Sequence, residues 1–152
     1  MLFGIKYNAS MNKIPRITID TNVLVAALKS RRGASYKLLS YLGQNLYTFV
    51  LSVPALMEYE DVLKRKNLDI KVSHKTIDDI LDRLAYLGEH REIFFLWRPY
   101  LKDLKDDLFL ELAVESNCDY IVTYNKSDFV GMDKFSIQAL TPKEFLLKAG
   151  II

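Results

Sequence analysis

Four acidic residues follow predicted strands or begin predicted helices, and this placement suits metal chemistry. Asp20 comes directly after a short β-branched run, and Glu58 lies about a turn into the helix after a second strand. Asp107 begins a later helix, and Asp128 follows a third strand. Mg²⁺ and Mn²⁺ are hard cations that prefer oxygen ligands, so a few carboxylates suffice to bind one. A bound cation lowers the pKa of a water and stabilises charge on a phosphodiester, so these acids predict a divalent-metal site.

The elements that must position these acids alternate between strand and helix along most of the chain. β-Branched and apolar runs predict strands at 16–19, 47–51, 93–97, 120–123 and 136–140. Apolar spacing and capping residues predict helices at 22–29, 34–42, 54–66, 75–88 and 106–117, and a last helix after Thr141. This alternation predicts an α/β fold with a central parallel sheet and helices on both faces. The acids are expected to meet at the carboxyl edge of that sheet.

Length and composition fit one domain of ordinary globular character. We expect residues 1–14 to be a loosely held lead-in and residues 15–152 to form the domain. Basic residues exceed acids by 21 − 19 = 2, too few to indicate a nucleic-acid partner by themselves. The single cysteine, Cys118, cannot form an internal disulfide, and no apolar run reaches transmembrane length. The sequence therefore predicts a cytoplasmic protein without a membrane partner.

Four segments around the acids resemble the signature segments of PIN-domain proteins. They are residues 17–24, 52–59, 106–113 and 120–129, in the order that the family has them. The resemblance spans about residues 15–146 and is strongest to the bacterial VapC-like subgroup, the toxins of toxin–antitoxin pairs. It implies a Rossmann-like PIN domain that hydrolyses RNA phosphodiester bonds with Mg²⁺ or Mn²⁺. It also implies an RNA substrate, a cognate antitoxin and a homodimer.

The resemblance assigns roles to the acids. Asp20, Glu58 and Asp107 match the three main acid positions of the family. Asp107 is preferred to Asp106 because its spacing to the strand-end threonine, Thr123, matches the family's spacing. The catalytic acids implied are Asp20, Glu58, Asp107 and Asp128. The metal ligands implied are Asp20, Asp107 and Asp128.

Four further residues are expected to support the acids. Asn22 matches the family residue that holds the first acid and its loop. Thr123 either hydrogen-bonds a site acid or simply ends a strand, and Glu111 lies one turn beyond Asp107 on the same helix face. Asn125 stands where many PIN domains have an acid, two residues after the strand-end threonine. Because asparagine brings no charge, the cation would be held by fewer negative charges unless the later acid, Asp128, reaches it.

Each assignment has an alternative without a metal. Asp20 could serve only as the N-cap of the next helix, Glu58 as an exposed helix acid, and Asp107 as a charge favoured by the helix dipole. Basic residues at helix ends are candidates for RNA contact, although the dipole also favours them there. These candidates are Arg31, Arg32, Lys64 and Arg65.

The sequence is also compatible with two other functions. A PIN fold with weak or lost catalysis could act as a binding or scaffold module, and Asn125 favours that alternative. An aspartate-nucleophile phosphotransferase also places an acid after its first strand. Such enzymes usually have a second acid two residues later, where this chain has Asn22, and a lysine opposite, which is not evident here.

Overall fold

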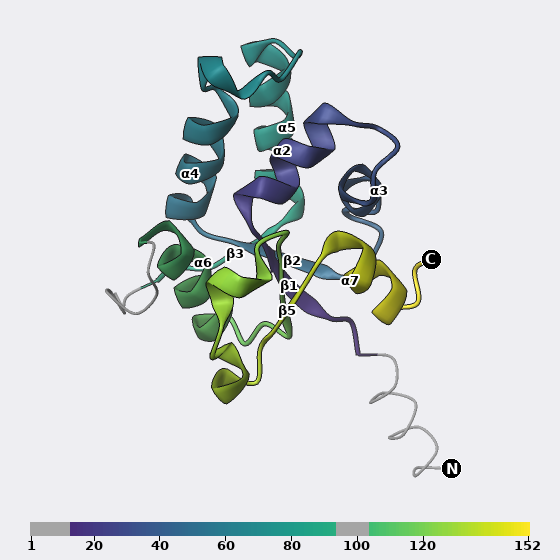
Figure 1. Ribbon diagram of the computed structural model, residues 1–152, viewed down its shortest axis with the longest axis vertical. Coiled ribbons are helices and arrows are strands. Elements are labelled where there is room, and N and C mark those ends of the chain that lie inside the picture. The colour runs from purple at the N-terminus through teal and green to yellow at the C-terminus, as the bar shows by residue number, and fades with distance from the viewer. Residues whose placement is uncertain (1–12, 94–103) are drawn as a thin grey trace.

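A five-stranded parallel sheet forms the centre of the computed structural model, which describes residues 13–93 and 104–152, with only the backbone for residues 104–107. The strand order is β3-β2-β1-β4-β5, and every neighbouring pair is parallel. The strands are β1 (Arg16–Ile19), β2 (Thr48–Leu51), β3 (Glu89–His90), β4 (Tyr120–Val122) and β5 (Gln138–Leu140). All carboxyl ends therefore lie at one edge, as the sequence predicts, and β1 is the central strand (Figure 1).

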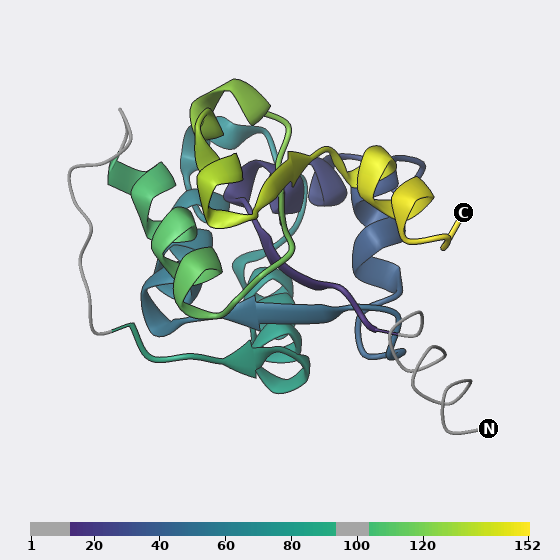
Figure 2. The same ribbon diagram turned by 90° about the horizontal axis from the view of Figure 1, so that it is seen from below.

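Helices cover both faces of the sheet, which confirms the predicted α/β class. They are α2 (Thr21–Lys29), α3 (Ala34–Ser40), α4 (Val53–Leu63), α5 (His74–Leu87), α6 (Leu104–Glu115) and α7 (Pro142–Lys148). In Figure 2, α6 in green lies on one side of the strands, and α3 in blue and α7 in yellow lie on the other. Short 3₁₀ turns complete the chain at η1 (Lys66–Leu68), η2 (Lys126–Phe129) and η3 (Met132–Phe135).

Apolar side chains of the central strands and the helix faces form one core. Ile17, Thr18, Ile19, Ile121 and Val122 are fully buried, so β1 and β4 are buried on both faces, as expected for central parallel strands. Local signals start several helices as predicted. Thr141 and its partner three residues later form a capping box at α7, with both reciprocal hydrogen bonds present.

One predicted helix ends earlier in the structure, one predicted strand lies mostly outside the described residues, and one strand was not predicted. The helix predicted over 54–66 ends at Leu63, because the chain then turns into the separate η1. The strand predicted over 93–97 falls on residues 94–97, which the structure does not describe, and Ile93 is not in a strand. The sequence missed β3, a two-residue strand whose Glu89 receives a hydrogen bond from Arg16 Nη1 at 3.1 Å.

In the described ranges, no helix is both long and apolar enough to cross a membrane. Cys118 is a free thiol, as the sequence predicts. It is buried, and burial raises its pKa to about 12. The lead-in predicted for residues 1–14 lies almost wholly among the residues that the structure does not describe.

Candidate functional site

Asp20 lies at the turn between β1 and α2, and only 7% of it is exposed. Its Oδ1 accepts a hydrogen bond from the Thr21 backbone N–H at 2.8 Å, so it is the N-cap of α2. Its Oδ2 accepts from Thr123 Oγ1 at 2.7 Å and from Asn22 Nδ2 at 3.2 Å. The capping role that the sequence left as an alternative is therefore real. Capping uses Oδ1 of the carboxylate, while Oδ2 faces Thr123 at the end of β4.

Thr123 connects the ends of β1 and β4. Its side chain is fully buried, and its Oγ1 accepts hydrogen bonds from the Asn125 backbone N–H at 3.0 Å and from Asn22 Nδ2 at 3.4 Å. Asn22 Oδ1 in turn accepts from the Tyr124 backbone N–H at 3.2 Å. Thr123 therefore does more than end a strand, because its hydroxyl fixes the Asp20 carboxylate. Asn22 contacts the first acid, as the resemblance implies.

Tyr59 of α4 contacts the end of β1 next to Asp20, and no pattern in the sequence predicted this role. It is fully buried, its hydroxyl donates to the Ile19 carbonyl just before Asp20, and its ring stacks on Phe109 of α6 at 5.8 Å between centroids. Burial and the nearby charge of Asp20 raise the Tyr59 pKa well above its usual value, so the phenol stays protonated and can donate. Tyr59, the residue next to Glu58, therefore connects α4 to the end of β1 that precedes Asp20 and to α6, which contains Asp107.

Negative charge converges on Asp20. Burial is the main cause that raises the Asp20 pKa, and the hydrogen bonds from Thr123 and Thr21 oppose it. The charges of Asp128 and Glu58 raise it further, which places both carboxylates close enough to act on Asp20. Glu58 is half-buried, and Asp128 is exposed on η2. Three of the four predicted acids therefore share one electrostatic environment at the carboxyl edge.

The remaining predicted residues lie on α6 and η2. Asp107 is in the first turn of α6, and its side chain is outside the described part of the structure. Glu111 lies one turn further along α6 and is 1% exposed. Asn125 precedes η2 with an exposed side chain, and its carbonyl accepts from the Asp128 backbone N–H at 3.0 Å. Within the described residues, no three His, Cys, Asp or Glu side chains form a ready-made metal cluster.

The basic residues predicted to contact RNA lie away from these acids. Arg31 and Arg32 are exposed between α2 and α3, while Lys64 and Arg65 follow α4. Because α2 and α4 both begin at the carboxyl edge, their far ends lie about 14–16 Å from it at 1.5 Å per residue. Lys64 also pairs with Asp78 at 2.6 Å, and Arg65 pairs with Asp61 of α4 at 2.8 Å. The structure therefore does not bring these four residues to the group formed by Asp20, Glu58 and Asp128, which we call the acid cluster.

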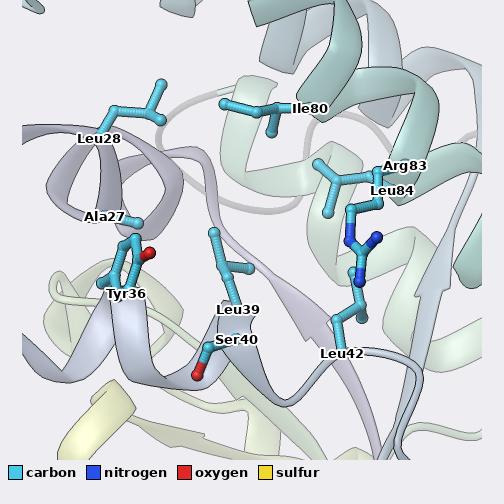
Figure 3. A pocket seen from close by; sticks show the side chains of 9 residues that line it. All are labelled: Ala27, Leu28, Tyr36, Leu39, Ser40, Leu42, Ile80, Arg83 and Leu84. Carbon is cyan, nitrogen blue, oxygen red and sulfur yellow. The ribbon is translucent and has the colours of Figure 1, made fainter. Parts of the chain in front are cut away.

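A separate pocket of about 270 Å³ lies among α2, α3 and α5 (Figure 3). Its walls are mainly apolar, with Leu28, Leu39, Ile80 and Leu84 facing the space. Arg83 is the one charged residue among the nine that line it, and no carboxylate does. The pocket therefore lacks the ligands of a hard cation and is distinct from the acid cluster.

The parallel sheet and the acids at its carboxyl edge define an α/β protein of the Rossmann-like class. The PIN-domain family profile matches residues 16–127, so the chain belongs to the PIN-domain family, whose members are in general nucleases that use divalent metal ions. Among solved structures, one chain of VapBC2 from Rickettsia felis, bound to a DNA fragment from its promoter, has a similar fold. The identity is 19%, the TM-score is 0.57, and the match covers 82% of this chain and 98% of that one. No curated protein matches the sequence.

Proposed function

We propose that this protein is a divalent-metal-dependent endoribonuclease and the toxin of a toxin–antitoxin pair. The observation that carries the proposal is the convergence of charge on Asp20, where Asp128 and Glu58 both raise the pKa of a buried carboxylate. Burying an acid beside two like charges costs free energy, and a bound cation would offset that cost. Membership of a family of nucleases makes phosphodiester hydrolysis the reaction that this arrangement supports best.

The donor set fits Mg²⁺ or Mn²⁺, with Asp20, Asp107 and Asp128 as ligands and Glu58 completing the acid cluster. A carboxylate offers about four acceptor positions, and Asp20 uses three of them for hydrogen bonds. One position on Oδ1 is therefore left for a cation, while Thr123 and Asn22 fix the orientation of the group. When bound, the cation would supply an activated water and neutralise charge on the phosphate.

Asn125 is where the site differs from many PIN domains. Its exposed side chain can offer an amide oxygen but no charge. The rival function, a scaffold with lost catalysis, depends on this difference. Even with asparagine at this position, a nuclease would have three acids near one another, namely Asp20, Glu58 and Asp128. Asp107 would be the fourth acid.

The partners follow from the same proposal. The structural neighbour is a VapBC2 complex, and we extend its pairing to this chain as an antitoxin that inhibits RNA cleavage. We further propose a homodimer that acts on RNA in the cytoplasm, as the resemblance to VapC-like proteins implies. Co-expression with the protein encoded by the adjacent gene tests the pairing, because growth inhibition by the toxin alone should then be relieved.

Cleavage of a labelled single-stranded RNA by the purified protein tests the central claim. Activity should require Mg²⁺ or Mn²⁺, stop with EDTA and fall at least about 100-fold in Asp20→Asn, since even the partners of metal ligands contribute 10- to 100-fold. The matched control is Asp61→Asn, an exposed acid on α4 that pairs with Arg65. Cleavage by this control should stay within about two-fold of wild type.

Two results would reject the proposal. Equal cleavage by wild type and Asp20→Asn would show that the acids do not perform the chemistry. Absence of metal-dependent cleavage in a folded, pure protein would instead favour the scaffold module. Thermal unfolding of both variants keeps loss of folding apart from loss of catalysis.

A further inference from the structure

Tyr124 is an exposed aromatic residue that is held in place next to the acid cluster. It directly follows Thr123, and its backbone N–H donates to Asn22 Oδ1 at 3.2 Å. Its hydroxyl forms a 2.6 Å hydrogen bond with Ser35 Oγ on α3, and Ser35 is only 1% exposed. Both ends of the residue are therefore fixed, one at the site and one at a buried hydroxyl.

The ring of Tyr124 is nevertheless left open. Its relative exposure is 45%, and within the described residues no other aromatic ring packs against it. The bond to Ser35 occupies the hydroxyl at the tip, so it restrains the ring without covering it. An aromatic side chain that is both restrained and accessible loses little conformational entropy when a flat ligand stacks on it.

The position of the Tyr124 ring indicates which flat ligand could stack on it. Tyr124 is bonded directly to Thr123, whose hydroxyl donates to Asp20 Oδ2 at 2.7 Å. A phosphodiester held at the acids would therefore carry a neighbouring nucleotide past Tyr124. Bases of single-stranded RNA are unstacked and available, whereas those of a duplex are stacked inside the helix.

We propose that Tyr124 stacks on an unpaired base next to the phosphodiester that is cleaved. This inference rests on the proposed nuclease function and adds a residue that contacts the substrate. Stacking on an aromatic side chain tolerates any base, so Tyr124 would contribute affinity more than sequence preference. The role is distinct from catalysis, because the ring contacts the substrate and not the reacting phosphate.

A purely structural role is the alternative, because the Ser35 bond also ties α3 to the end of β4. Two substitutions separate the roles. Tyr124→Phe keeps the ring and removes the hydroxyl bond, while Tyr124→Ala removes both. The matched control is Tyr86→Ala, which removes an 87% exposed tyrosine from α5.

Binding of a fluorescently labelled single-stranded RNA, measured by anisotropy in EDTA, gives a readout that does not require cleavage. We expect Tyr124→Ala to weaken binding about 10-fold or more, within the range known for loss of one stacked base. Tyr124→Phe and Tyr86→Ala should stay within about three-fold of wild type. Binding of a blunt RNA duplex should be insensitive to Tyr124→Ala.

Cleavage supplies the second readout once the cut bond is mapped. Wild type should cleave an RNA with an abasic nucleotide on one side of that bond more slowly than it cleaves normal RNA. The loss of cleavage rate should equal the loss that Tyr124→Ala causes with normal RNA. The two changes should not add when combined, as expected for partners in one contact.

The outcomes separate this inference from the proposed function. If wild type binds RNA without cleaving it, the nuclease proposal fails and the binding assay still tests stacking. If Tyr124→Ala binds as tightly as wild type, or Tyr124→Phe is as weak as Tyr124→Ala, the stacking proposal is wrong. If wild type does not bind RNA at all, both fail.

Discussion

Replacing Thr123 by valine removes one hydroxyl from a fully buried position and changes the side-chain shape little. That hydroxyl donates to Asp20 Oδ2 at 2.7 Å and accepts from the Asn125 backbone N–H at 3.0 Å. Asn22 Nδ2, 3.4 Å from the same oxygen, keeps its 3.2 Å contact with Asp20. We therefore expect Thr123→Val to destabilise the fold and loosen the Asp20 carboxylate together.

The size of the effect follows from these contacts. A hydrogen bond to a charged group contributes about 1.5–3 kcal/mol. The Asn125 N–H loses its acceptor at a partly buried position, where water replaces the bond in part, at a cost of about 0.5–1 kcal/mol. The free energy of unfolding should fall by about 2–4 kcal/mol. With a urea dependence of about 2 kcal/mol per molar, the unfolding midpoint should fall by about 1–2 M.

The effect should also depend on pH. Burial raises the pKa of Asp20 in the folded state, and the bond from Thr123 opposes that rise. A raised carboxyl pKa means that the contribution of Asp20 to stability is fully present below the unfolded-state value and is lost as pH rises through the folded-state value. Thr123→Val raises the Asp20 pKa further, so its stability deficit should be largest near pH 7–8 and shrink toward about pH 4.

Thr123→Ser is the matched control, because it keeps the hydroxyl and loses only a methyl group. It should lower the free energy of unfolding by about 1 kcal/mol, with little dependence on pH. Equal urea midpoints for the valine and serine variants would contradict this role of the Thr123 hydroxyl. A deficit in Thr123→Val that stays constant between about pH 4 and pH 8 would also refute it, since the bond would then not act on a charged Asp20.

Two further predictions concern the cation and the buried tyrosine. Saturating Mg²⁺ or Mn²⁺, at about 100 times the dissociation constant, should raise the Tm of wild type by about 5–10 °C in a thermal scan and leave Asp20→Asn unchanged. Tyr59→Phe, which leaves the buried Ile19 carbonyl without its hydroxyl donor, should lower the free energy of unfolding by about 1–2 kcal/mol in urea titrations and weaken metal binding measured by calorimetry. An unchanged metal affinity in Tyr59→Phe would limit that residue to a stabilising role.

Local signals allowed much of this fold to be predicted from the sequence. The β-branched run before Asp20, the Pro–Glu pair after Thr141 and the apolar stripe of α5 each act within a few residues, so one segment contains the whole signal. The alternation of such segments then determines a parallel sheet and the edge at which Asp20 and Asp128 meet. Placement of these acids required no knowledge of side-chain contacts.

Contacts between distant residues could not be predicted in this way. The bond between Tyr59 and Ile19 joins residues 40 positions apart, and that between Ser35 and Tyr124 joins residues 89 positions apart. Neither has a periodic pattern, because each depends on where two completed elements happen to pack. The strand β3 was missed for a similar reason, since two residues are too few to show alternation.

The hydrogen bonds of the backbone explain how the site can tolerate asparagine at position 125. The bond that this residue makes to Thr123 Oγ1 comes from its backbone N–H, so any residue except proline can make it. The side chain is exposed and contributes nothing to the hydrogen bonds that hold Asp20. Exchange of an acid for asparagine therefore changes the charge available to a cation and leaves the scaffold around Asp20 intact. Fold and charge at this edge can vary independently, which is why a PIN fold alone does not determine catalytic strength.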